Sequence, residues 1–410
     1  MFKLNNKIAF TRDVITDVYN YYSKLAFCDA VRLLIKTNLL DNEDKSIILK
    51  ATLAATESKN FLTKSYVIYL SNFILSENKM EKILQIKKQL IFEIGIMLLE
   101  HNIEKKILFK NENKMLFSLR LNKHINKKFD VIKKRDNLYF FYYFNNEVLK
   151  IEKNNEFGIT KDIDLLEDDR NPFNNHSDHP DQEFVAYDLG GIPKEKWVLQ
   201  FRNAYKIIKE KVPEIYEEIY YFLDAVVPHG YVYGKQLSSS YSKSPGILYL
   251  SYTNTDTEQA EAIIHEVHHT IYNIINWKYK LVNNDMSLKY YSAYRPDARH
   301  INGCFIGLHA FVAVQNFYRK LAETENKTKF IEKFFKLYLK NKIVISVLKK
   351  YADFTKEGKL LFQDIKTKYC SDTGFFEELK NKNTDIYNHV LQRINGHLEE
   401  AKKRNETLLY

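Results

Sequence analysis

Apolar residues in the first hundred positions recur at spacings of three and four, which is typical of α-helices with one buried face. The pattern is clearest in IILKATLAATESKNFL (47–62) and MEKILQIKKQLIFEIGIMLLE (80–100). The aromatic run NLYFFYYF (137–144) instead indicates a β-strand. We therefore expect residues 1–160 to form a mainly helical N-terminal region.

The second half of the chain shows longer periodic segments. Residues 196–227 predict a helix that is interrupted near Pro213, and residues 238–253 alternate like a strand or hairpin. AEAIIHEVHHTIYNII (260–275) and FIGLHAFVAVQNFYRKLAE (305–323) have the spacing of buried helices. The acidic, turn-rich stretch 162–184 is typical of a long loop or a boundary.

These patterns predict an α+β protein that is mainly helical. A small antiparallel sheet is expected beside the helix that contains residues 260–275, with helical N-terminal and C-terminal regions on either side of it. The corresponding division is 1–160, a central catalytic core at 161–325 and a charged helical region at 326–410.

Composition and charge narrow the classes of partner. The chain carries 62 basic and 52 acidic residues, a net charge of +10, and residues 101–136 alone hold eleven Lys or Arg against four Asp or Glu. This stretch is either a solvated surface or a docking surface for an acidic peptide. No nucleic-acid motif accompanies the charge, so we expect no nucleic-acid partner.

Three isolated cysteines argue against a disulfide framework and fit a reducing compartment. The N-terminus lacks the apolar run of a signal peptide, and no apolar segment is long enough for a bilayer. We therefore expect a cytoplasmic protein with no membrane partner.

The segment 260–275 contains the motif His-Glu-x-x-His at His265, Glu266 and His269. Thr255 and Glu258 have the form of a capping box, which predicts a helix that starts near Thr255. Two histidines four apart lie on the same helix face, where their imidazoles can share one metal ion and Glu266 can reach its open side.

A metal ion needs a third ligand from elsewhere in the chain. The metzincin continuation would place Gly at 272 and His at 275, but this chain has Tyr272 and Ile275 there. Glu323 and Glu325 stand in a polar stretch that is typical of a surface. His309, in an otherwise apolar helical segment, is the better candidate; His268 falls on the apolar stripe and is interpreted as a packing or supporting residue.

The segment YSAYRPDARHINGCFIGLHAFVAV (291–314) resembles the stretch that follows the HExxH helix in the α-ketoglutarate-dependent HExxH-type peptide β-hydroxylases. This segment matches part of the family pattern, which is Ser-Pro, then Arg-Pro-Asp-Pro-Arg-Pro, then a Gly and an apolar helix with His-Ala-Phe. The upstream segments DLGG, VPHGY, SSSY and GILYLSY are also similar, so the resemblance covers about residues 170–320. The matching residues are Arg295, Pro296, Asp297, Arg299, Gly303, His309, Ala310 and Phe311, whereas Ala293, Ala298 and His300 replace prolines.

The resemblance implies Fe(II), 2-oxoglutarate and O2, which act on a ribosomally synthesised precursor peptide that a radical-SAM enzyme also modifies in many such systems. It implies a metal held by His265, His269 and His309, although Asp297 or Glu266 could supply a carboxylate ligand instead. Arg295 and Arg299 are the candidates to bind the distal carboxylate of 2-oxoglutarate, with Ser240 and Tyr241 as hydroxyl donors. Each arginine could alternatively form an ordinary salt bridge with Asp297.

Two rival functions remain at this stage. A zinc metallopeptidase would use His265 and His269 as ligands and Glu266 as the general base. A catalytically silent peptide-binding protein would tolerate loss of His265. For the peptide of the hydroxylase, two binding modes are open: it could bind the basic stretch 101–136, or add as a strand to GILYLSY (246–252), if that strand lies at a sheet edge.

Overall fold

The computed structural model describes residues 10–57, 61–62, 65–111, 116–118, 120–153, 158–159, 163–168, 187–231 and 237–404. The chain forms two compact units that alternate along the sequence. Unit 1 comprises Met1–Thr16, Asn203–Phe222 and Thr255–Tyr410, and unit 2 comprises Asp17–Arg202 and Leu223–Asn254. Among the described residues, no helix combines the length and apolar character that a membrane crossing requires.

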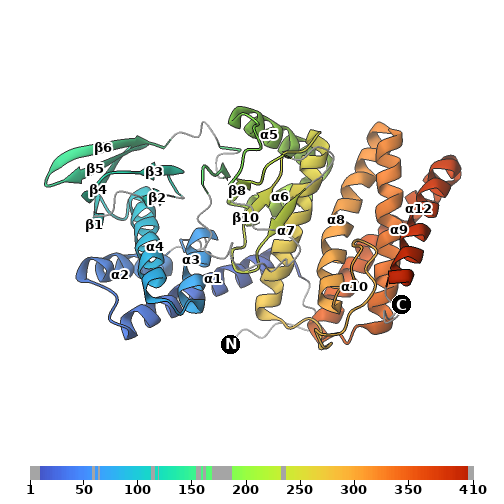
Figure 1. Ribbon diagram of the computed structural model, residues 1–410, viewed down its shortest axis with the longest axis horizontal. Coiled ribbons are helices and arrows are strands. Elements are labelled where there is room, and N and C mark those ends of the chain that lie inside the picture. Colours follow the sequence, from blue (N-terminus) through green and yellow to red (C-terminus); the bar gives the residue numbers. More distant parts are fainter. Residues whose placement is uncertain are drawn as a thin grey trace. The chain divides into compact units, whose positions relative to one another are not determined.

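Unit 1 is built from helices, and in it α7 packs on α8 and α8 packs on α9 (Figure 1). Its helices are α6 (Pro213–Phe222), α7 (Asp256–Lys278), α8 (Ile301–Glu325), α9 (Thr328–Tyr351), α10 (Lys356–Ser371), α11 (Thr373–Lys382) and α12 (Thr384–Arg404). Two further helices cross between the units: α1 (Arg12–Lys36) and α5 (Lys194–Lys211).

Unit 2 contains the helices of the N-terminal region and most strands. Its own helices are α2 (Asn42–Glu57), α3 (Ser65–Ser76) and α4 (Met80–Glu100). An antiparallel sheet in the order β1-β4-β5-β6 packs against α4, whose residues 90–99 are all buried. The strands are β1 (Lys106–Asn111), β4 (Phe129–Arg135), β5 (Leu138–Tyr143) and β6 (Asn146–Glu152), with β2 (Leu116–Ser118) and β3 (Lys123–Ile125) as a separate pair. The basic stretch 101–136 therefore supplies four of these strands.

A second sheet of unit 2 has the order β7-β8-β10-β9. Its strands are β7 (Asp164–Leu165), β8 (Ala225–Pro228), β9 (Ser238–Ser240) and β10 (Ile247–Leu250). β9 and β10 form the predicted hairpin, but β10 also pairs with β8 in parallel. The sheet is thus mixed, and β10 is an interior strand. The hypothesis that a peptide adds to GILYLSY at a sheet edge is therefore wrong, because both sides of this strand are already hydrogen-bonded.

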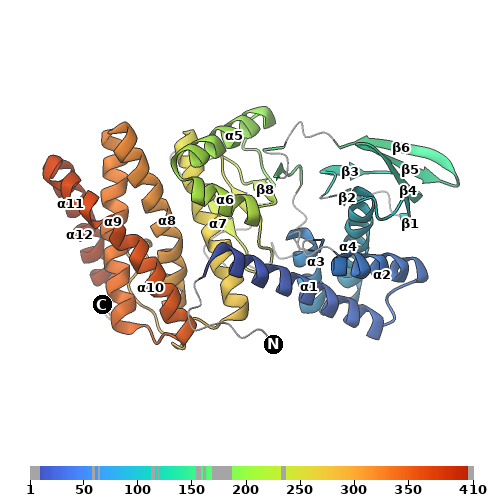
Figure 2. The same cartoon turned by 180° about the vertical axis from the view of Figure 1, so that it is seen from behind.

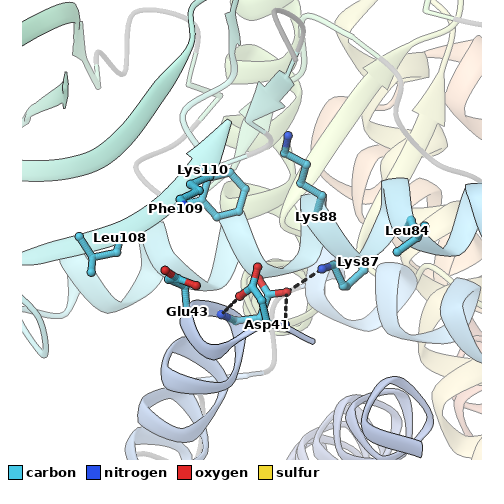
Figure 3. Close-up of a pocket in the computed structure, with 9 residues that line it drawn as sticks. Asp41, Glu43, Leu84, Lys87, Lys88, Leu108, Phe109 and Lys110 are labelled. Carbon is cyan, nitrogen blue, oxygen red and sulfur yellow. Dashed lines mark hydrogen bonds and ion pairs between the residues drawn. The ribbon is translucent and has the colours of Figure 1, made fainter. Parts of the chain in front are cut away.

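A shallow hollow in unit 2 shows how α2 is attached to α4. Asp41 Oδ1 accepts a hydrogen bond from the Asp44 amide at 2.7 Å, which caps the start of α2. Lys87 on α4 donates to Asp44 Oδ2 at 2.6 Å and to the Leu39 carbonyl at 3.0 Å. In Figure 3 a dashed line joins Lys87 to the acidic group at this helix start, while Lys88 extends away from it. The acidic groups here join two helices, so we assign the hollow a structural role.

The predicted α+β class with a mainly helical content is confirmed. The helix break at Pro213 is also confirmed, because α5 ends at Lys211 and Pro213 is the first residue of α6. Most of the predicted loop 162–184 lies outside the described residues. The division at 160 and 325 stays a prediction about independent folding, although the two compact units interleave along the chain.

Candidate metal centre

The motif helix α7 has the start and the buried face that the sequence predicts. The Thr255 side chain, in an extended conformation at the N-cap, accepts a hydrogen bond from the Glu258 amide at 3.2 Å. One face of the helix is then fully buried. Its apolar members are Ala260, Ile263, Ile264, Val267, Ile271, Ile274 and Ile275. Burial of this stripe fixes the rotation of α7 and hence the direction of the two motif histidines.

The three motif side chains converge on one place. One ligand atom each of His265, Glu266 and His269 lies within 4.8 Å of the others. The two imidazole rings are 4.3 Å apart between centroids, and His265 Nε2 is 4.0 Å from Glu266 Oε1. Among the described residues, these three side chains form the compact group whose ligand atoms could bind a metal ion. Such spacing suits one cation held by two imidazoles.

His265 is prepared to bind a cation. Its Nδ1 is buried and has no hydrogen-bond partner in the part of the chain that the structure describes. Burial, and to a lesser extent the nearby charge of His268, lowers the pKa of His265 to about 4. The ring is therefore neutral at physiological pH and keeps a lone pair. A neutral ring with a buried nitrogen that no protein group engages fits a metal ligand better than a packing residue.

His268 is held in a different way, against α6. Its Nδ1 lies 2.8 Å from the Ile264 carbonyl and its Nε2 lies 3.2 Å from Glu218 Oε2. Because both neighbours are acceptors, the ring either carries two protons or shares one with the carboxyl group. Burial would raise the pKa of Glu218, but the hydrogen bond and charge of His268 outweigh it and lower that pKa. This pairing agrees with the interpretation of His268 as a supporting residue.

His309 on α8 packs beside His268 and Tyr272, with ring centroids 5.4 Å and 5.9 Å away. Its Nδ1 donates to the His268 carbonyl at 2.9 Å, so in the neutral ring Nε2 bears the lone pair. Burial, then the charges of His268 and Lys368, hold the pKa of His309 well below its ordinary value. Metal-binding histidines commonly donate their second nitrogen to a carbonyl in this way. His309 does not belong to the compact cluster of His265, Glu266 and His269, and its role as third ligand stays a prediction.

A polar and aromatic network supports His265 from α8 and α9. The Phe311 ring lies 4.5 Å from His265, and Tyr294 stacks on Phe311 at 4.3 Å. Tyr294 donates to Asn341 Oδ1, and Asn341 in turn donates to the Phe311 carbonyl at 3.2 Å. The supporting roles of Tyr294, Asn341 and Glu218 were not predicted from the sequence. Only Phe311 and Tyr294 stood in a segment that the resemblance singled out, while Asn341 and Glu218 come from other helices.

Arg295 and Arg299 share a single carboxylate. Arg295 Nε lies 3.1 Å from Asp297 Oδ1, and Arg299 Nε lies 2.8 Å from Asp297 Oδ2. The backbone of Arg299 also exchanges two hydrogen bonds with Tyr290, at 2.7 and 2.9 Å. The two arginines thus lie close together, and each forms the salt bridge with Asp297 that was considered as the alternative to binding 2-oxoglutarate. A carboxylate of a bound ligand would have to bind these arginines alongside Asp297, or displace Asp297 from them.

Ser240 and Tyr241 belong to unit 2, whereas the histidines and arginines belong to unit 1. Ser240 ends β9 and is paired with Leu248, and Tyr241 packs on Tyr249 with ring centroids 5.1 Å apart. Their role as hydroxyl donors to a bound 2-oxoglutarate stays a prediction.

The chain matches no family model, and no curated protein is significantly similar to it.

Proposed function

We propose that the protein is an Fe(II)- and 2-oxoglutarate-dependent dioxygenase that hydroxylates Cβ of a residue in a ribosomally synthesised peptide. The observation that carries the proposal is the convergence of His265, Glu266 and His269, together with the buried, unpartnered Nδ1 of His265. The resemblance of the Arg-Pro-Asp-x-Arg segment and of His309 to the peptide β-hydroxylases supports iron and 2-oxoglutarate over zinc. A radical-SAM enzyme acting on the same peptide remains part of this proposal.

The donor set fits such an ion. Imidazole suits Fe(II) as well as zinc, and three protein ligands leave positions for a chelating 2-oxo acid and for O2. When bound, the iron and 2-oxoglutarate supply the oxidation, in which one oxygen atom enters the peptide and the other enters succinate. His265 and His269 would hold the ion, with His309 as the third ligand through Nε2.

The other residues of the centre would neutralise the distal carboxylate of 2-oxoglutarate and position the groups around the ion. Arg295 and Arg299, joined through Asp297, would offer guanidinium groups to the distal carboxylate of 2-oxoglutarate. Glu266 is only 3% exposed and would orient a ligand or a water beside the ion. His268, fixed by Glu218, would hold the carbonyl that accepts from His309.

One observation favours zinc peptidase activity as a second candidate. The Glu266 carboxylate lies within the compact cluster, where a general base would have to stand to take a proton from a metal-bound water. The peptidase would not need a paired-arginine site.

Anaerobic addition of Fe(II) and 2-oxoglutarate, followed by optical spectroscopy, tests the proposal. A weak visible charge-transfer band is expected in the wild type and in the control His389→Ala, an exposed histidine of α12. Loss of the band in His265→Ala and His309→Ala would support both as ligands. Stoichiometric Zn(II) binding without any band for iron would contradict the dioxygenase and favour the peptidase, with Glu266 as its base.

A further inference from the structure

A groove lined by basic side chains runs between α9 and α12, which lie side by side in both views of unit 1 (Figures 1 and 2). Its larger part, about 350 Å³, lies between α9 and the start of α7 near Thr255. Its smaller part, about 180 Å³, lies between α9 and α12. The two parts share the lining residues Glu332, Lys336 and Arg393, so they adjoin each other.

Two of the cations in the groove are already neutralised. Lys333 pairs with Glu261 at 2.9 Å, and Arg393 pairs with Glu332 at 3.0 Å. Lys336 and Lys340 are different: within the described part of the chain, no carboxylate lies within salt-bridge distance of either. Both are half-buried and both line the smaller cavity.

The two lysines stand one helical turn apart, so their side chains leave the same face of α9 and can reach one small ligand. Burial, followed by repulsion from Lys336, Lys333 and Arg393, lowers the pKa of Lys340 to about 8. The pKa of Lys336 is lowered as well, first by burial and then by Lys333 and Arg393. Glu261 and Glu332 offset part of this repulsion at Lys336, and a bound anion would offset it further.

We propose that this groove binds a compact dianion, which Lys336 and Lys340 neutralise, and that the ligand is the phosphate group of a small phosphorylated molecule. The charge of the two ammonium groups, neither of which has a carboxylate within salt-bridge distance among the described residues, matches that of one phosphate monoester. An extended acidic peptide would need a row of unpaired cations along the groove. Lys333 and Arg393 are engaged by carboxylates, and Lys329 shares the larger cavity with the acidic side chains of Glu258 and Glu332. Val390 and Ile394 give the smaller cavity an apolar wall for the rest of the ligand.

The site is distinct from the candidate metal centre, since none of His265, Glu266, His269 and His309 lines either cavity. It therefore does not depend on the proposed dioxygenase activity. A short dicarboxylate shares the chemistry of a compact dianion, so it has to be compared with phosphate directly.

Binding of inorganic phosphate to the full chain, measured by calorimetry at constant ionic strength and near pH 7, tests the proposal. In Lys336→Gln/Lys340→Gln the affinity should fall at least about ten-fold. The matched control Lys342→Gln/Lys349→Gln removes the same charge from exposed positions of α9 and should bind like the wild type. Equal binding by both double variants would overturn the site, and tighter binding of succinate than of phosphate would overturn the choice of ligand.

A second measurement needs no variant. Lysine acetylation of the wild type, followed by mass spectrometry at about pH 8, should modify Lys340 readily because much of it is unprotonated there. Saturating phosphate should slow the reaction of Lys340 several-fold and leave that of Lys342 unchanged. An equal effect of phosphate on both lysines would contradict the proposal even if the double variant failed to fold.

Discussion

At the scale of single residues, the geometry of His268 decides which histidines can bind a metal. Its two nitrogens are engaged by the Ile264 carbonyl and by Glu218, so it has no lone pair to offer a metal when it is doubly protonated. His265 and His309 are neutral by contrast, and the charge of His268 helps to lower the pKa of each. His268, with both nitrogens engaged, therefore differs from His265 and His309, which are neutral candidates for a ligand.

Glu218→Gln tests this support. The amide keeps the shape of the side chain but leaves the buried His268 without its anionic acceptor, so we expect a loss of about 1–3 kcal/mol in the free energy of unfolding. Urea denaturation near pH 7 measures it. Glu217→Gln, which alters a more exposed neighbour paired with Arg12, should cost less than about 0.5 kcal/mol. Equal losses in the two variants would show that the His268 pair contributes nothing specific.

The pH dependence of this effect has a defined sign. The pKa of Glu218 is lowered in the folded protein from its ordinary value of 4.5. A carboxyl group of this kind stabilises the fold above the unfolded pKa, and the contribution disappears as the pH falls through the folded pKa. The difference in unfolding free energy between wild type and Glu218→Gln should therefore shrink on acidification below pH 4.5. A difference that grows in this range would contradict the assignment.

At the scale of secondary-structure elements, local signals were sufficient for the helices. Thr255 and the apolar stripe predicted the start and the buried face of α7, and Pro213 predicted the break between α5 and α6. The parallel pairing of β10 with β8 was not predictable, because the residue pattern within a strand does not specify which other strand it pairs with. Glu218 was missed for the same reason: it reaches His268 from another helix, and no local spacing joins them.

The packing of α8 against the loop that carries Tyr294 depends on a glycine. A Cβ at Gly307 would lie 3.1 Å from Cδ2 of the Tyr294 ring, which is stacked on Phe311 and bonded to Asn341. Gly307→Ala should therefore lower the free energy of unfolding by about 1 kcal/mol, although alanine favours a helix.

The matched control is Gly396→Ala in α12, where a Cβ would meet nothing within 4 Å. It should raise the free energy of unfolding, by up to about 1 kcal/mol, through helix propensity alone. Urea denaturation of both variants gives the comparison. A stabilised Gly307→Ala protein would mean that Tyr294 has room to move and does not constrain Phe311.

At the scale of the whole molecule, the two units are not successive segments. α1 and α5 each run through a boundary between them, and unit 1 collects three separate stretches of chain. The predicted catalytic core 161–325 contains the motif helix, Glu218 and His309 but lacks α9 and α10. Asn341, which accepts from Tyr294, and Asp372, which accepts from Gln315 at 2.7 Å, both lie beyond it.

We therefore expect residues 161–325, produced alone, not to fold cooperatively. The fragment would expose the face of α8 that α9 covers, including the buried Tyr318, whose ring lies 6.2 Å from that of Phe330 on α9, and would leave the buried Gln315 without its acceptor. Calorimetry of the fragment should show no sharp unfolding transition, while the full chain shows one or more. A longer fragment, 161–404, restores α9 to α12 and is the matched comparison. If residues 161–325 unfold cooperatively and bind one metal ion through His265 and His269, the core is an independent domain and the helices that follow it serve another purpose, such as binding the dianion.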